Sequence, residues 1–112
     1  MADQGKSSTG LQANVAALLA YVLGIVTGLV FFLIEKENKF VKFHAMQSIA
    51  FSLVLFVAGF VMAFIPFIGV LGTMVLQLGG LVVWILLMVK AFQGERFKLP
   101  VLGDFAEKQA GA

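Results

Sequence analysis

Hydrophobic and polar positions divide the chain into three long apolar runs separated by short polar segments. The runs cover residues 14–34, 45–65 and 68–89, and none of them contains a charged side chain. A hydrocarbon core of about 30 Å is crossed by roughly 20 helical residues, and a lone strand would leave its backbone groups unpaired in lipid. The pattern therefore predicts an all-α integral membrane protein with three transmembrane helices.

The segments outside the runs set the predicted domain boundaries. Residues 1–13 are small and polar and predict a disordered N-terminal tail. Residues 14–103 form the expected three-span domain, in which Pro66 ends the second run because proline removes a backbone donor. Residues 104–112 are expected to be a flexible cytoplasmic tail.

The polar stretch before the second run predicts an amphipathic start to that helix at the membrane interface. Asn38 is the expected N-cap. Phe40 and Phe43 suit the interface or the top of the bundle. Basic side chains here and in the C-terminal segment are predicted to reach lipid headgroups, because long cationic side chains extend toward phosphates; they are Lys39, Lys42, Arg96 and Lys98.

His44 and Gln47 lie three residues apart and are therefore neighbours on the helix surface. Two interpretations stay open for them. In the functional one they bind a lipid headgroup, gate the bundle or plug its mouth. In the structural one they form a hydrogen-bonded pair that ties the second helix to the C-terminal segment.

Small residues recur at helical spacing and predict faces where helices approach closely. Ala20, Gly24 and Gly28 follow one another at i+4 in the first run, and Gly59 lies on a similar face of the second. In lipid, helices associate where small side chains let their backbones meet. The pattern does not decide whether these faces pack within the chain or against a second copy.

Gln77 lies near the middle of the third run, on the side that carries Thr73. An amide in hydrocarbon is costly unless it is hydrogen-bonded, so Gln77 is expected to face protein or water. It forms either an interhelical hydrogen bond or, together with Ser48 and Ser52, the lining of a solute path.

Composition supports the membrane class and narrows the chemistry. Of the 112 residues, 61% are hydrophobic and 12% charged, and a soluble domain this small could not bury so much apolar surface. The absence of cysteine excludes disulfide scaffolds and thiolate sites, and a single histidine is a weak metal signal. No nucleophile with a base and an oxyanion motif is present. The sequence predicts no enzyme, no cofactor and no metal.

The basic residues predict an orientation. Lys6 precedes the first run, whereas the other seven of the eight Lys and Arg residues fall in the first loop or the C-terminal segment. With three spans these two regions share one side, which the positive-inside rule assigns to the cytoplasm. The N-terminus is then expected outside a prokaryotic plasma membrane. This distribution also explains the net charge of +2 without nucleic acid.

Several motifs together resemble the prokaryotic branch of the Tic-twenty-like family, which is named after a chloroplast inner-envelope component of the protein-import translocon. The motifs are Tyr21 with Gly24, the element Phe40, Phe43, His44, Ala45 and Gln47, and the late group Ala91, Gly94, Leu99 and Pro100. The resemblance covers about residues 16–103 and implies a small helical membrane protein. The plant members have an additional span that the pattern lacks here, so a translocon role is not carried over.

Three functions are compatible with these features. The first is a non-enzymatic membrane protein that acts by helix–helix assembly, with a second copy or a larger membrane protein, or by binding lipid. The second is an oligomeric channel or translocon-like component lined by Ser48, Ser52, Thr73 and Gln77. The third is an anionic-lipid-binding protein.

Overall fold

A computed structural model describes residues 5–36 and 38–111, and its regular secondary structure in these residues is helical. An isolated bridge joins Lys6 and Gln12. The prediction of an all-helical protein is therefore confirmed. The helices are α1 (Ala13–Val22), α2 (Ile25–Ile34), α3 (Lys39–Met62), α4 (Ile68–Phe92) and α5 (Leu102–Ala110).

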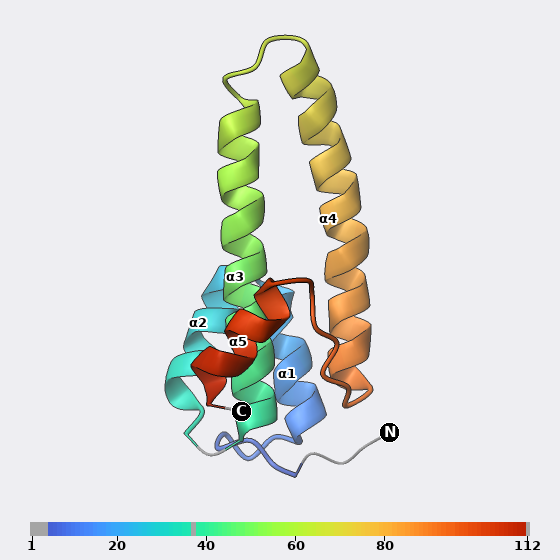
Figure 1. The fold of residues 1–112 in the computed structure, drawn as a ribbon. Coiled ribbons are helices and arrows are strands. Elements are labelled where there is room, and N and C mark those ends of the chain that lie inside the picture. The colour runs from blue at the N-terminus through green and yellow to red at the C-terminus, as the bar shows by residue number, and fades with distance from the viewer. Residues whose placement is uncertain (1–4, 37, 112) are drawn as a thin grey trace.

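The two long helices, α3 and α4, form an antiparallel hairpin that runs the length of the molecule (Figure 1). α1, α2 and α5 surround only the lower half of this hairpin, where α1 packs on α3 and α4, and α2 and α5 pack on α3. The upper half consists of α3 and α4 alone. The molecule measures 48 × 23 × 21 Å, with both ends of its described chain at the lower end.

The first apolar run is not a single span. Gly24 has φ +62°, which glycine adopts without steric cost, and it separates α1 from α2. The hydroxyl of Thr27 accepts the amide of Leu23 and donates to the carbonyl of Ala20, so it satisfies backbone groups exposed by the break. Each helix has ten residues, or about 15 Å, and α2 turns back beside α1. In place of the predicted span over 14–34, the structure has a hairpin of two helices, each about half as long as a span requires.

The hairpin brings the N-terminal segment next to the loop that precedes α3. The Ser8 amide donates to the Glu35 carboxylate at 2.9 and 3.0 Å, and the Asn38 side-chain amide donates to the Lys6 carbonyl at 3.2 Å. The N-terminal turn and the first loop therefore lie at the same end of the molecule, whereas the sequence predicts them on opposite sides of the membrane. Residues 5–12 form a hydrogen-bonded turn and Ala13 begins α1, whereas residues 1–4 of the predicted disordered tail lie outside the described residues.

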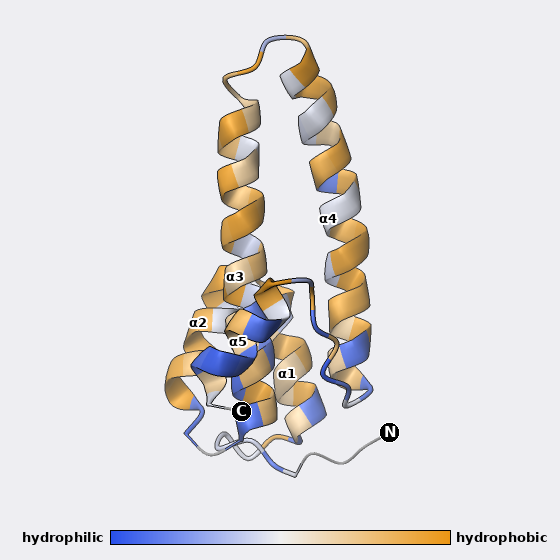
Figure 2. Cartoon of the chain, viewed as in Figure 1, coloured by the Kyte–Doolittle hydropathy of each residue, from blue (hydrophilic) through white to orange (hydrophobic). Residues whose placement is uncertain are grey.

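α3 and α4 are long and apolar enough to cross a membrane, so the structure has two candidate spans where the sequence predicts three. Asn38 caps α3 as predicted, its side-chain oxygen accepting the Val41 amide at 3.2 Å. Pro66 lies in the turn between the two helices. Figure 2 shows that the upper hairpin is apolar, whereas hydrophilic residues gather at the lower end.

The first turns of α3 do not lie at an open interface. Phe40, Phe43 and His44 are each at most 2% exposed, because α1, α2 and α5 enclose this part of α3. The main buried apolar cluster lies here and joins α1, α3 and α4; its residues are Ala13, Ala16, Ala17, Tyr21, Phe40, Val41, Leu87 and Ala91.

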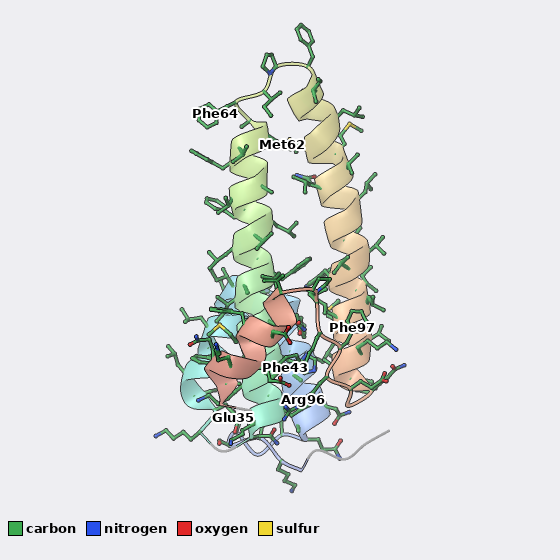
Figure 3. All side chains as sticks on the ribbon, viewed as in Figure 1. Glu35, Phe43, Met62, Phe64, Arg96 and Phe97 are labelled. Carbon is green, nitrogen blue, oxygen red and sulfur yellow. The ribbon has the colours of Figure 1, made fainter. Side chains whose placement is uncertain are left out.

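The segment predicted as a flexible tail forms α5. Its Ala106 and Ala110 pack on Phe43 of α3, and Gly111 ends the helix in the left-handed conformation at φ +75°. Figure 3 places Phe43 and Arg96 at this lower end and Phe64 at the opposite tip of the hairpin.

Candidate functional site

A buried polar trio joins α1 to α3. The Tyr21 hydroxyl lies 2.7 Å from Nδ1 of His44, and Nε2 of Gln47 donates to the same hydroxyl at 3.0 Å. All three side chains are fully buried. Phe40 and Phe43 pack on the His44 ring in T-shaped contacts, at centroid distances of 4.7 and 5.0 Å.

The proton positions in the trio follow from its partners. Nε2 of His44 lies 2.8 Å from the carbonyl oxygen of Glu95, which can only accept, so Nε2 carries the proton. Nδ1 then accepts from Tyr21, and Tyr21 accepts from Gln47. Each polar atom thus has a consistent role, and the arrangement holds α1 and α3 in one relative position.

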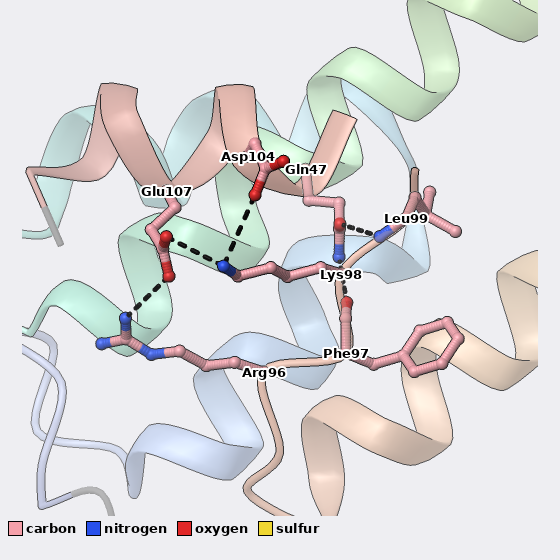
Figure 4. Close-up of polar contacts among 7 residues, drawn as sticks. All are labelled: Gln47, Arg96, Phe97, Lys98, Leu99, Asp104 and Glu107. Carbon is pink, nitrogen blue, oxygen red and sulfur yellow. Dashed lines mark hydrogen bonds and ion pairs between the residues drawn. The ribbon is translucent and has the colours of Figure 1, made fainter. Parts of the chain in front are cut away.

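The trio also binds the segment between α4 and α5, residues 95–101, which we term the strap. Gln47 donates to the Phe97 carbonyl at 2.8 Å and accepts the Leu99 amide at 2.9 Å (Figure 4). Together with the contact of His44 to Glu95, these bonds pin the strap across α3. This geometry is the one described by the structural interpretation of His44 and Gln47.

Ion pairs hold α5 on the strap. Lys98 lies 2.9 Å from Glu107 and 3.5 Å from Asp104, and Arg96 lies 3.9 Å from Glu107 (Figure 4). The hydrogen bond from Lys98 to Glu107 raises the pKa of Lys98. Arg96 and Lys98, predicted to bind lipid headgroups, face α5 carboxylates instead.

Glu35 anchors the N-terminal turn. Its carboxylate accepts hydrogen bonds from the Ser7 hydroxyl, from the Ser8 hydroxyl at 2.6 Å and from the backbone amide of Asn38 at 3.0 Å. Burial favours a higher pKa for Glu35, but these hydrogen bonds outweigh it and lower the pKa below its ordinary value of 4.5. Glu35 is 1% exposed, so its charge is stabilised by these hydrogen bonds rather than by solvent.

The cations at the start of α3 differ from those of the strap. Nζ of Lys42 lies 4.9 Å from the centroid of the Phe32 ring of α2 and faces that ring. Lys39 is exposed. In the part of the chain that the structure describes, the ion pairs of basic residues involve Lys90, Arg96 and Lys98, and neither Lys39 nor Lys42 takes part in one.

The small residues of the first run pack within the chain. Gly28 is buried against α3: a Cβ placed there would lie 3.0 Å from the Ala45 carbonyl and 3.2 Å from Cβ of Ser48. Ala20 is fully buried, and the Ser48 hydroxyl donates to the Gly24 carbonyl at 3.1 Å. Gly59 behaves differently, since a Cβ added to it would meet no described atom within 4 Å.

Ser52, Thr73 and Gln77 lie on the upper hairpin, where α3 and α4 leave an open groove of about 380 Å³. We call this the α3–α4 groove; it is lined by Ser52, Leu55, Phe56, Gly59, Thr73, Leu76 and Gln77. Gln77 is exposed, so its own chain does not enclose it, and the expectation that it faces protein or water stays a prediction. Its amide takes part in none of the side-chain hydrogen bonds among residues 5–36 and 38–111.

Tyr21 and Trp84 are not among the predicted site residues. Tyr21 completes the trio, and the Trp84 indole donates to the Tyr21 carbonyl at 2.5 Å. Each is the chain's one residue of its type, set within an apolar run, where a buried polar group must find a partner. That signal marks both as candidates, but it does not identify their partners.

Comparison with known proteins places the chain in a family. Residues 7–106 match the model of the magnetosome magnetite crystal formation protein family. The chain belongs to this family. A UPF0132 membrane protein of Methanocaldococcus jannaschii is 47% identical over 108 residues, covering 96% of this chain and 97% of the relative. A UPF0132 membrane protein of Archaeoglobus fulgidus is 46% identical over 101 residues, covering 90% and 98%.

The archaeal relatives are named as membrane proteins, which supports the membrane assignment, and their names state no activity. The match covers the hairpin, the trio, the strap and most of α5. It does not bear on the Tic-twenty-like resemblance. No solved structure matches the chain. Within the described residues, no three His, Asp or Glu side chains come together as a metal site.

Proposed function

We propose that the chain is a non-enzymatic membrane protein that acts by assembly, with the α3–α4 groove as the surface that receives another transmembrane helix. The observation that carries this proposal is the exposed Gln77 amide in the apolar half of the hairpin. The groove is the place where an incoming helix would meet that amide.

The depth of Gln77 makes its exposure costly in lipid. It lies nine residues from the start of α4, or about 13 Å along the helix, which is close to the middle of a hydrocarbon core of about 30 Å. No water is available there, and an interhelical hydrogen bond is the usual way to satisfy such a group.

The contrast with the lower half supports the same conclusion. Every buried polar side-chain atom of the described chain has a hydrogen-bond partner, including those of Tyr21, His44 and Gln47. The protein therefore satisfies its polar groups wherever its own helices surround them. Gln77 is left for a partner that is supplied by another chain.

The fold supports a topology with both ends of the described chain in the cytoplasm. All eight Lys and Arg residues lie at one end of the molecule, in the N-terminal turn, the loop before α3, the first turns of α3, the last turn of α4, the strap and α5 (Figure 2). The positive-inside rule then favours α3 leaving the cytoplasm and α4 returning to it.

Anionic lipid is a second ligand favoured by one observation. Lys36, Lys39 and Lys42 surround the end of α2 without an ion pair among the described residues, and the outer face of α2 is apolar. Each such cation near an anionic leaflet contributes about 1 kcal/mol of attraction. Binding through these lysines should weaken at high salt, whereas assembly through Gln77 should not.

The assembly proposal is tested with a photo-crosslinking amino acid in native membranes. Placed at Thr73, inside the groove, it should give adducts with another polypeptide. Placed at Val75, which is 63% exposed and lies on the opposite side of α4, it should give lipid adducts only. Absence of any protein adduct at Thr73 would show that the groove receives no helix.

A further inference from the structure

We infer that the occupant of the α3–α4 groove is a second copy of this chain, packed about a twofold axis that passes near Gln77. This inference rests on the proposed assembly function and adds the identity of the partner. The evidence is the chemistry of the groove, the shape of the hairpin and the backbone approach at Gly59.

The polar groups of the groove are self-complementary. The Gln77 amide has two donor hydrogens and an acceptor oxygen, and the hydroxyls of Ser52 and Thr73 both donate and accept. In a twofold interface the same patch meets itself, so residues near the axis face their own copies. Two Gln77 amides across such an axis can exchange a pair of hydrogen bonds. A charged or donor-only side chain could not do this.

The hairpin leaves room for a copy of itself. The contact of Gly24 with Ser52, where an added Cβ would lie 3.0 Å from the hydroxyl, marks the tip of the α1–α2 hairpin. Beyond this point α3 and α4 have only each other among the described helices (Figure 1). Phe56, for example, is 72% exposed. Two upper hairpins placed groove to groove would form a four-helix arrangement with the polar residues inside.

Gly59 provides the close approach that such packing requires. It lines the groove, and a Cβ added to it meets no atom of the described chain within 4 Å. By contrast, a Cβ at Gly80 would meet Leu55 at 3.0 Å, so Gly80 serves the contact between α3 and α4 themselves. Gly59 thus has no side chain and borders open space, so the backbone of a neighbouring helix can approach it closely.

The chain has no cysteine, so single-cysteine variants report one pair of positions in a dimer. The purified full-length protein is reconstituted alone in phospholipid vesicles and treated with a short bismaleimide. Thr73→Cys should give a species of doubled mass, and the matched control Val75→Cys should not. Adding Gln77→Leu should weaken self-association about tenfold, as expected from the loss of about 1.4 kcal/mol of hydrogen bonding.

Energy transfer between labelled copies, measured over a range of protein-to-lipid ratios, gives the dissociation constant for each variant. Gln77→Asn, which keeps an amide, should retain more association than Gln77→Leu. Gln77 is exposed and has no bond within the described chain, so Gln77→Leu should leave the monomer folded. If the strap of the Gln77→Leu variant resists protease as well as the strap of the natural protein does, the monomer is folded.

The vesicle and native-membrane experiments together separate the possible partners. A dimer in pure vesicles that Gln77→Leu weakens supports the inference. A monomer in pure vesicles, combined with a Thr73 adduct to a different protein in native membranes, overturns the second copy but leaves the assembly function. No adduct in either system overturns both. A dimer that crosslinks equally from Val75 and ignores Gln77→Leu overturns this interface.

Discussion

Two glutamines with the same chemistry occupy opposite situations in the molecule. Gln47 is fully buried and makes hydrogen bonds to Tyr21, Phe97 and Leu99, whereas Gln77 is exposed on the upper hairpin. The amide of Gln47 joins three segments of one chain. Its contribution is therefore to the stability of the fold, whereas the contribution we propose for Gln77 is to contact with another chain.

Replacing Gln47 by leucine should reduce the free energy of unfolding by about 2–4 kcal/mol, because the Leu99 amide and the Phe97 carbonyl lose their side-chain partner. Denaturant titration in detergent measures this change. Gln77→Leu is the matched control and should stay within about 0.5 kcal/mol of the natural protein. Equal effects of the two substitutions would show that the trio does not hold the strap.

The Glu35 carboxylate predicts a pH-dependent release of the N-terminal turn. Because its pKa in the folded protein lies below the ordinary 4.5, its contribution to stability is complete above 4.5 and is lost as the pH falls through the lower, folded value. A spin label on Thr9→Cys should be immobile at pH 7 and become mobile in acid, once the pH falls below the lowered pKa of Glu35. With Glu35→Gln the label should be mobile at both pH values. A label that stays immobile in acid would contradict the anchoring role.

At the scale of the helices, the two kinds of small-residue face have separate uses. The face of α2 that contains Gly28 presses on the α3 backbone, and the face of α3 that contains Gly59 is open. The sequence pattern predicts close packing at both but cannot distinguish them. Periodicity identifies a face, whereas the partner of that face depends on how the chain folds back.

Alanine substitution distinguishes these faces. Gly28→Ala places a methyl group 3.0 Å from the Ala45 carbonyl, so α2 must move away from α3 at a cost of about 1–3 kcal/mol. Gly59→Ala meets nothing within the described chain and should leave the stability of the monomer unchanged. Thermal unfolding of the two variants in detergent, where copies are diluted, gives the comparison. A loss of stability at Gly59 as large as that at Gly28 would contradict the open face.

Gly24 explains why the sequence predicts three spans and the structure has two. The run from 14 to 34 is apolar throughout, so hydropathy is the same for a helix that crosses the bilayer and for two short helices that return. The positive φ of Gly24 and the bonds of the Thr27 hydroxyl to the end of α1 produce the return. Glycines in apolar runs also serve straight, close-packed helices, so the break could not be recognised from composition.

At the scale of the whole molecule, the sequence predicts the membrane class and the helical fold. It also predicts the hairpin of α3 and α4 and the cap at Asn38. The trio could be predicted only in part, since helical spacing pairs His44 with Gln47 but does not bring in Tyr21. Contacts with residues far along the chain, such as Glu95 with His44, depend on how α5 and the strap fold back, which local pattern does not encode.

The topology is the prediction that belongs to this scale. Thr9→Cys and Lys36→Cys should both be shielded from an impermeant maleimide in intact cells and react after permeabilisation. Phe64→Cys, at the opposite tip and 73% exposed, should react in intact cells. Reaction of Thr9→Cys from outside would restore a crossing by the first run and contradict the half-depth hairpin.

The gathering of charge at one end has a consequence for biosynthesis. Between Lys42 and Lys90 the chain contains no Asp, Glu, Lys or Arg. In the proposed topology, the part that reaches the far side of the bilayer can therefore enter as a loop without carrying an ionised group through hydrocarbon, which costs about 2.5–3.5 kcal/mol per charge during insertion. Both ends of the described chain can stay on the ribosome's side of the membrane while the hairpin of α3 and α4 inserts.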